Sequence, residues 1–258
     1  MPSSLFDLTG KNALVTGGSK GIGKAVARGL AEQGADVVIT SRHEDELKAA
    51  AAEIGDGLDI RVETFVGDMT DRDKTDELAT WVVETMGGVD ILFNNAGSNT
   101  PQPLVELTDE VWDRLIELNV TSCMRLTRAI VPQMIERGWG RIIYNASVMA
   151  LVATEGRSTY CATKAAVVAM VRAQSLEFGR HGITVNAISP GPIMTDLPMS
   201  CFSDEQKQAF ARRTAVHRWG QPEELAGPVI MLASDAGSFV TGENLVIDGG
   251  MVNRVFES

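Results

Sequence analysis

Features that mark secreted, metal-binding or membrane proteins are scarce in this sequence of 258 residues. It has three cysteines and three histidines, and Cys123, Cys161 and Cys201 are far apart and without metal-ligand spacing. We therefore expect reduced thiols and no metal site. No apolar run approaches the roughly 18–20 residues that a transmembrane helix needs. The first residues lack the basic and apolar segments of a signal peptide, which favours a cytoplasmic location.

Positive charge is also in short supply. The chain carries 23 Lys and Arg against 34 Asp and Glu, a formal net charge of −11. Proteins that bind nucleic acids or anionic lipid surfaces obtain much of their affinity from clustered Lys and Arg, so we expect neither partner. Hydrophobic residues make up 44% of the chain and charged residues 22%, as in an ordinary globular protein. No linker or repeat divides it, so residues 1–258 are expected to form a single domain.

Short β-branched runs alternate with longer helical patterns along the whole chain. The strand candidates are residues 12–16, 36–40, 60–66, 90–93, 141–146, 183–189 and 244–247. The helical patterns are 22–33, 44–54, 71–86, 109–137, 158–180 and 222–234. Near-continuous apolar strands separated by helices predict an α/β fold, a Rossmann-type doubly wound parallel sheet with helices on both faces. The stretch of about 191–219 interrupts the alternation and is predicted to form a lid over a substrate.

Glycines gather directly after the first strand, in TGGSKGIG at residues 16–23. Gly17, Gly21 and Gly23 would let the backbone approach a pyrophosphate and let the next helix pack closely, while the helix N-terminus offers amide donors. Ser19 and Ile22 lie in the same loop. A glycine loop between a first strand and a helix is the context that dinucleotide binding requires, so we expect a nucleotide cofactor here.

The end of the second strand indicates which nucleotide is bound. Sites selective for NAD usually have Asp or Glu there to hold the ribose 2′-hydroxyl. Here the strand runs into Ser41 and Arg42, and Lys20 stands in the glycine loop. A guanidinium and an ammonium suit a 2′-phosphate. The sequence therefore predicts NADP(H), bound in a locally positive pocket of an acidic protein.

Two further strand ends offer polar or small residues. The third strand runs into Asp68 and Met69, and the fourth into Asn95, Ala96 and Gly97. In open α/β sheets, ligands bind at the carboxyl ends of the strands. We expect both segments to line the cofactor site, the first of them beside the adenine.

Tyr160 and Lys164 are four residues apart on a predicted helix and so share a face. An ammonium beside a phenol stabilises the phenolate, which makes a tyrosine usable as a general acid or base. Ser147, just past the fifth strand, is placed to hydrogen-bond a substrate carbonyl or its alkoxide. Together these side chains could move a proton at a carbonyl oxygen.

In order and spacing, the motifs resemble the short-chain dehydrogenase/reductase family over nearly the whole chain. They are TGGSKGIG at 16–23, NNAG at 94–97, Asn119 within ELNV, Ser147, YCATK at 160–164 and PG at 190–191. The resemblance implies a seven-stranded sheet in the order 3-2-1-4-5-6-7 and nicotinamide-dependent interconversion of a ketone and a secondary alcohol. It also implies a homotetramer, in which the 109–137 and 158–180 helices pair across a dimer.

The same resemblance implies a role for each reacting residue. Tyr160 would exchange a proton with the substrate oxygen, which Ser147 would orient. Lys164 would assist Tyr160 and hold the nicotinamide ribose, and Asn119 would hold a water in a proton relay. Residues after the sixth strand would complete the cofactor site: Pro190, Gly191, Ile193 and Thr195.

The sequence leaves the substrate open. The family branches that look nearest are ketone reductases, gluconate 5-dehydrogenase-like sugar-acid or polyol enzymes, and 3-oxoacyl carrier-protein reductases. Carrier-protein reductases tend to present two arginines to the carrier. Arg125 fits one of these positions but Leu176 occupies the other, which favours a ketone, polyol or sugar-acid substrate. A non-catalytic dinucleotide-binding regulator is disfavoured because the whole reacting set is present.

Overall fold

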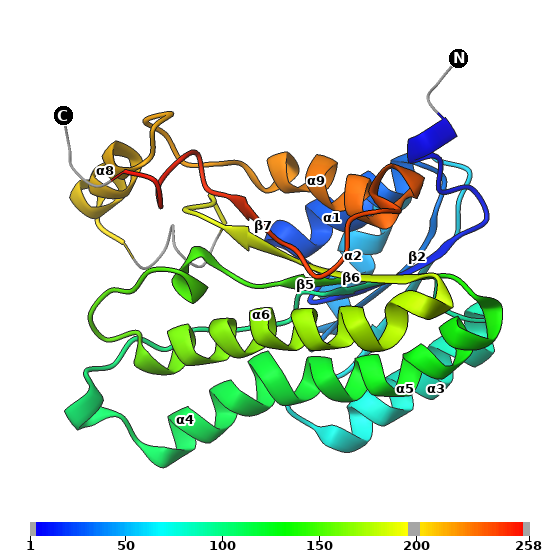
Figure 1. Ribbon diagram of the computed structural model, residues 1–258, viewed down its shortest axis with the longest axis horizontal. Coiled ribbons are helices and arrows are strands. Elements are labelled where there is room, and N and C mark those ends of the chain that lie inside the picture. The colour runs from blue at the N-terminus through cyan, green and yellow to red at the C-terminus, as the bar shows by residue number, and fades with distance from the viewer. Residues whose placement is uncertain (1–3, 196–201, 255–258) are drawn as a thin grey trace.

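The computed structural model describes residues 4–195 and 202–254, and a sheet of seven parallel strands forms its centre (Figure 1). The spatial order is β3-β2-β1-β4-β5-β6-β7, which confirms the predicted sheet. The strands are β1 Asn12–Thr16, β2 Asp36–Ser41, β3 Val62–Val66, β4 Ile91–Asn94, β5 Gly140–Asn145, β6 Ile183–Pro190 and β7 Asn244–Ile247. The order reverses beside β1, so the carboxyl ends of β1 and β4 border the crevice where such sheets bind ligands.

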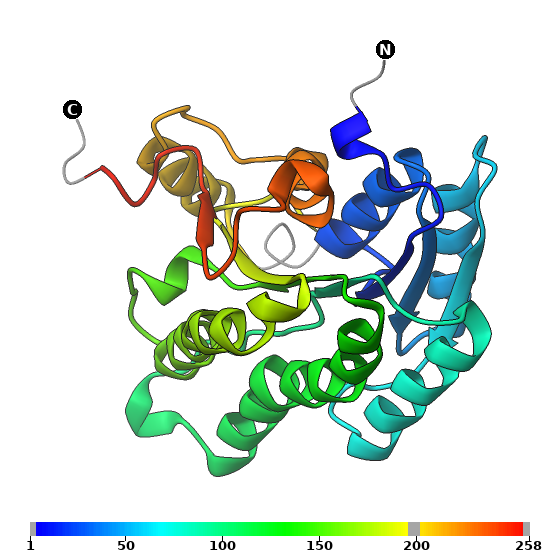
Figure 2. The same cartoon turned by 45° about the vertical axis from the view of Figure 1, so that its right-hand side comes forward.

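Helices cover both faces of the sheet. On one face lie α1 Gly21–Glu32, α2 Glu44–Gly55 and α9 Ala226–Ala233. On the other lie α3 Arg72–Met86, α5 Ser122–Arg137 and α6 Ser158–Phe178, with α4 Asp109–Ile116 leading into α5. Figure 2 shows α1 (blue) and α9 (orange) side by side and the green helices across the sheet from them. In the described ranges, no helix combines the length and apolarity needed to cross a bilayer.

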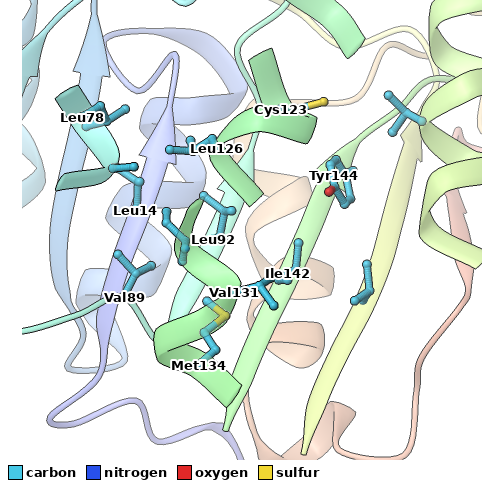
Figure 3. Packing of buried hydrophobic residues seen from close by; sticks show 14 of the residues in the cluster. Leu14, Leu78, Val89, Leu92, Cys123, Leu126, Val131, Met134, Ile142 and Tyr144 are labelled. Atoms are coloured by element: carbon cyan, nitrogen blue, oxygen red, sulfur yellow. The ribbon is translucent and has the colours of Figure 1, made fainter. Parts of the chain in front are cut away.

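Two apolar cores result, one on each face of the sheet. Leu14 of β1 lies in the core that it shares with Leu78 of α3 and Leu126 of α5 (Figure 3). Its neighbour Val15 lies in the opposite core with Leu30 of α1. Successive strand side chains point to opposite faces, so each central strand must be apolar along its whole length. This explains why the sequence pattern located the strands.

The predicted helix 109–137 has the predicted bounds, but it is not α-helical along its whole length. Between α4 and α5 the chain forms a π-helical turn, Glu117–Thr121. Asn119 lies in this turn, with its buried side chain bonded to the main chain of Ser98 and to Thr163. Wide turns of this kind recur at functional sites. Apolar periodicity does not separate an α-turn from a π-turn, because the flanking helices keep their own patterns.

The segment predicted as a lid contains a helix that the sequence analysis did not predict, α8 Asp204–Arg213. Ser203 and Gln206 begin it with a capping box: Ser203 Oγ accepts from Gln206 N (3.2 Å) and Gln206 Oε1 accepts from Ser203 N (3.0 Å). The Phe210 and Trp219 rings, 5.5 Å apart between centroids, join α8 to the end of the segment. Residues 196–201 of the predicted lid lie outside the described residues.

Candidate functional site

The glycine loop joins β1 to α1 at the crevice. Gly17 and Gly21 adopt left-handed φ angles of 66° and 54°, which residues with a side chain rarely adopt. A Cβ on Gly23 would lie 2.2 Å from the Gly17 carbonyl oxygen, so this glycine lets helix and loop touch. In the described part of the chain, α1 follows its N-cap residue Lys20 without a side-chain cap and without an acidic residue in its first turn. Its first amides are therefore suited to an anion such as a pyrophosphate.

Polar contacts tie this loop to the end of β4. The Thr16 hydroxyl accepts hydrogen bonds from the main-chain N–H groups of Asn95 (3.0 Å) and Ala96 (2.9 Å). The Asn95 side-chain amide donates to the carbonyl oxygens of Thr16 (2.9 Å) and Gly17 (3.1 Å). Two segments predicted to bind the cofactor therefore form one hydrogen-bonded unit.

Charged side chains near the end of β2 form matched pairs. Lys20 Nζ lies 3.0 Å from Glu46 Oε2 of α2, and Arg42 Nη1 lies 4.0 Å from Asp68 Oδ2. The prediction of a locally positive pocket was wrong in this respect, because two carboxylates balance the two cations. The contact with Glu46 depends on how α2 lies beside the loop, which the sequence pattern does not reveal.

Two further side chains at this end bear on nucleotide binding. Burial of Asp68 would raise its pKa, but hydrogen bonds from Thr70 N (2.9 Å) and Thr70 Oγ1 (2.8 Å), together with the charge of Arg42, lower the pKa overall. Asp68 is thus a carboxylate at neutral pH. The Ser41 hydroxyl oxygen is buried and has no hydrogen-bond partner among the described residues. An orphaned hydroxyl at the end of β2 fits a site completed by a polar ligand.

A chain of hydrogen bonds links the predicted catalytic helix to the glycine loop. Lys164 is only 5% exposed, and its Nζ donates to the main-chain carbonyl of Asn145 at the end of β5 (2.6 Å). The Asn145 side-chain amide donates to Asn95 Oδ1 (2.8 Å). Asn95 in turn bonds the carbonyl of Gly17. The ammonium of Lys164 is therefore held on the same edge of the sheet as the loop.

Tyr160 and Ser147 complete the predicted reacting set. Tyr160 is half-buried one turn before Lys164, and the Lys164 ammonium lies 5.6 Å from the centre of its ring. Ser147 Oγ accepts a hydrogen bond from Met149 N (3.1 Å). A serine hydroxyl has one hydrogen to donate as well as lone pairs, so this contact leaves its O–H hydrogen for another acceptor.

The Asn119 side chain joins three segments of the site. Its Oδ1 accepts from Ser98 N (2.9 Å), and its Nδ2 donates to the Ser98 carbonyl (2.9 Å) and to Thr163 Oγ1 (3.1 Å). Gly97 separates it from Lys164: a Cβ there would lie 3.2 Å from Asn119 Oδ1 and 3.6 Å from Lys164 Nζ. Asn119 and Lys164 are thus close neighbours, as the predicted proton relay requires.

The segment after β6 returns to the glycine loop. Pro190 is the last residue of β6 and Gly191 follows it. Thr195 lies against Gly21, because a Cβ on that glycine would be 3.1 Å from Thr195 Cγ2. Ile193 is 7% exposed and pairs with Gly220 in an isolated bridge, so any cofactor contact there falls to its main chain.

The family model described as Enoyl-(Acyl carrier protein) reductase matches residues 17–252. The chain belongs to the short-chain dehydrogenase/reductase family. Its relatives are oxidoreductases that act on CH–OH groups with a nicotinamide dinucleotide, and this protein is an oxidoreductase of the same kind.

Three relatives illustrate how close the similarity is. Gluconate 5-dehydrogenase from Gluconobacter oxydans is 38% identical over 248 residues, 96% of each chain. A 3-oxoacyl-[acyl-carrier-protein] reductase from Vibrio cholerae is 37% identical over 249 residues, 95% of this chain and 99% of its own. The crystal structure of a gluconate 5-dehydrogenase from Burkholderia cenocepacia, in complex with NADP and tartrate, has a TM-score of 0.92 and 34% identity, and covers 98% of this chain and 99% of that chain.

Sequence reasoning missed three polar residues of this dehydrogenase/reductase site. Asn145 and Thr163 position Lys164 and Asn119, and Glu46 engages Lys20. For Asn145 there was a usable signal, since it is a polar residue at the carboxyl end of a strand, where ligands bind in such sheets. The other two face their partners only through helix packing. Met69, predicted to bind the cofactor, has its side chain in the core, so contact from that position falls to its main chain.

Proposed function

We propose that this protein interconverts a secondary alcohol and a ketone with NADP(H), using Tyr160 as the general acid and base. The observation that carries the proposal is the hydrogen-bonded path from Lys164 through Asn145 and Asn95 to the glycine loop. This path couples a proton-transfer helix to a loop suited to a dinucleotide. A purely nucleotide-binding protein would have no need of a buried lysine there, since burying an ammonium is costly.

Each reacting side chain has one task in the proposed mechanism. The bound nicotinamide would supply or accept the hydride at the carbon that carries the substrate oxygen. Tyr160 gives its proton to that oxygen in reduction and takes it in oxidation. Ser147 donates its free hydrogen to the same oxygen and stabilises the developing alkoxide. Lys164 uses one N–H for Asn145 and keeps two for a ribose hydroxyl and for the relay towards Asn119.

The preference for NADP(H) is supported by the residues around the end of β2. Arg42 and Lys20 can supply charge-assisted hydrogen bonds to a 2′-phosphate. The buried, unpartnered Ser41 hydroxyl fits the same ligand. The Burkholderia relative was crystallised with NADP. These observations favour NADP(H) over NAD(H) for this chain.

For the substrate we propose a polyol or sugar acid rather than a carrier-bound acyl group. The Arg125 side chain is 17% exposed and bonded to Asp76, so it is poorly placed to receive an acidic carrier protein. Arg157 is half-buried three residues before Tyr160 and has no side-chain partner among the described residues. The main-chain N–H of Gln102 donates to the Gly156 carbonyl (2.9 Å). The side-chain oxygen of Gln102, Oε1, is buried and has no hydrogen-bond partner among the described residues.

Unsatisfied polar groups beside the reacting helix suit a substrate rich in hydroxyl and carboxylate groups. The two relatives named gluconate 5-dehydrogenase, one of them bound to tartrate, support the same class. An enzyme for simple ketones remains the second candidate, favoured by the exposed apolar side chains of Leu151 and Val152 just before the reacting helix.

The decisive experiment compares the only two tyrosines of the chain. Tyr160→Phe should reduce turnover of a gluconate-like alcohol with NADP⁺ by about 10²–10⁴-fold, the usual contribution of a general acid or base, while NADPH binding is unchanged. Tyr144→Phe is the matched control. Its hydroxyl lies 2.8 Å from both Thr127 Oγ1 and Gln174 Oε1 in the core, so this variant should lose stability but retain turnover. Full turnover by Tyr160→Phe would refute the mechanism.

We also propose a homotetramer, a lid formed by residues 191–219 and a cytoplasmic location. One side of α6 carries the buried residues Val167, Val168 and Val171, whereas Ala165, Ala169 and the 85% exposed Leu176 face outwards. Burial of the whole helix within one chain is therefore ruled out, and its apolar outer side favours a partner helix.

The free thiols of Cys123 and Cys161 are typical of a reducing compartment, which supports the proposed cytoplasmic location.

A further inference from the structure

A small polar recess lies between the glycine loop and α2. It has a volume of about 280 Å³ and is lined by Lys20 and Glu46, which pair with each other, and by Glu53, whose partner is Lys24. Lys20 Nζ lies 3.0 Å from Glu46 Oε2, and Lys24 Nζ lies 2.7 Å from Glu53 Oε2. In both pairs α2 supplies the carboxylate, and the loop or α1 supplies the ammonium. Only the first pair involves a residue assigned to the cofactor.

The Lys20 ammonium therefore already has an anionic partner before any phosphate binds. The hydrogen bond from Lys20 is the main cause of the lowered pKa of Glu46; burial opposes this shift, and the charges of Lys20 and Arg42 add to it. Glu46 is thus ionised at neutral pH and interacts with the same cations that a 2′-phosphate would meet. Any phosphate that binds Lys20 must open this pair or accept a carboxylate as its neighbour.

Asp68, the other carboxylate of this region, is engaged differently. Its Oδ1 accepts two hydrogen bonds from Thr70, and its Oδ2 stands 4.0 Å from Arg42. Removing its charge would disturb the loop after β3 as well as the pair. Glu46 is 43% exposed and its ion pair is with Lys20, so its charge can be removed without disturbing a loop.

We propose that Glu46 sets how strongly this protein prefers NADP(H) to NAD(H), by competing with the 2′-phosphate for Lys20. The inference rests on the proposed function, which places the adenosine ribose between Lys20 and Arg42. A ribose with a 2′-hydroxyl meets no such competition, because it has no negative charge to exchange for the carboxylate. Glu46 therefore weakens binding of the phosphorylated nucleotide alone, and it holds the preference for NADP(H) below what Lys20 and Arg42 would give.

The test uses two nucleotide fragments that carry no nicotinamide, so that no turnover is needed. Titration calorimetry measures the dissociation constants of adenosine 2′,5′-bisphosphate and 5′-AMP with the full chain and its variants. Glu46→Gln keeps the shape of the side chain but removes its charge. We expect it to bind the bisphosphate about three- to tenfold more tightly, the scale of an exposed ion pair plus a like-charge contact, and to leave AMP unchanged.

Glu53→Gln is the matched control, because it removes the same charge from the same helix and breaks the neighbouring pair with Lys24. It should change both constants less than twofold. Lys20→Met should weaken the bisphosphate, and in the double variant Lys20→Met/Glu46→Gln the gain from the Glu46 change should vanish. That non-additivity is the signature of competition for Lys20 rather than of a general change in surface potential.

Three results would overturn the inference. Glu46→Gln could leave the bisphosphate constant unchanged or weaken it, which would mean that Glu46 does not oppose the phosphate. Glu53→Gln could tighten bisphosphate binding as much as Glu46→Gln does, which would mean that the change in net charge alone causes the effect. The gain could also persist without Lys20. If the wild-type chain binds neither fragment, the proposed nucleotide function itself fails. If the wild type binds the bisphosphate tightly and Glu46→Gln does not change its dissociation constant, only the role of Glu46 fails.

Discussion

Replacing Gly23 by alanine tests whether the glycine loop is shaped by contact with its own helix. Gly23 lies inside the first turn of α1, where alanine is intrinsically favoured by about 0.5–1 kcal/mol. Against this, the new Cβ would lie 2.2 Å from the Gly17 carbonyl oxygen and 2.6 Å from Asn95 Nδ2. The first of these atoms belongs to the backbone and the second is held by two hydrogen bonds, so neither can move without breaking contacts.

Overpacking of this kind costs about 1–3 kcal/mol, which outweighs the gain in helix propensity. We therefore expect Gly23→Ala to lower the free energy of unfolding by about 1–2 kcal/mol, measured by urea denaturation of the cofactor-free protein. It should also weaken NADP⁺ binding in calorimetry, because the displaced Gly17 carbonyl belongs to the loop that would hold the pyrophosphate.

Gly179→Ala provides the control for this prediction. Gly179 follows the last residue of α6 with helical backbone angles (φ −55°, ψ −40°), and a Cβ there would meet nothing within 4 Å. Only the effect on backbone freedom remains, so this variant should be more stable than the wild type by about 0.4–1 kcal/mol and should bind NADP⁺ normally. If Gly23→Ala proves as stable as Gly179→Ala, the close contact between loop and helix does not constrain the protein as argued.

Three more predictions follow from the site and its surroundings. Arg42→Asp should shift the ratio of NADP⁺ to NAD⁺ affinity towards NAD⁺ by roughly tenfold or more, the value of a charged hydrogen bond, and an unchanged ratio would contradict the assignment. Burial raises the pKa of Cys123 to about 12, so its reactive thiolate is scarce at about pH 8. After treatment of the folded protein with iodoacetamide at that pH, peptide mapping should find Cys123 unalkylated and the half-buried Cys161 alkylated. Light scattering after size-exclusion chromatography should give four times the chain mass, and Leu176→Arg should reduce it; a monomeric wild type would refute the tetramer.

The strands and most helices could be predicted because their signals are local. β1 and β7 have the predicted bounds, and the other strands differ from prediction by one or two residues at an end. The start of α4 carries a local signal too: Thr108 caps it, and its hydroxyl accepts from Val111 N (3.4 Å). The π-turn at Glu117–Thr121 was missed because it depends on bonds from Asn119 to segments 21 and 44 residues away.

By itself, the sequence determined the α/β class, the strand positions, the glycine loop and the reacting residue types, because a strand buried on both faces and a loop that needs glycine leave patterns in neighbouring residues. Only the tertiary structure decided which of these groups are coupled. Lys164 reaches Gly17 through Asn145 at the end of β5 and Asn95 just after β4, and Lys20 is paired with a carboxylate of α2. Ion pairs and hydrogen bonds depend on distances of about 3 Å between segments, and those distances exist only once the helices have packed on the sheet.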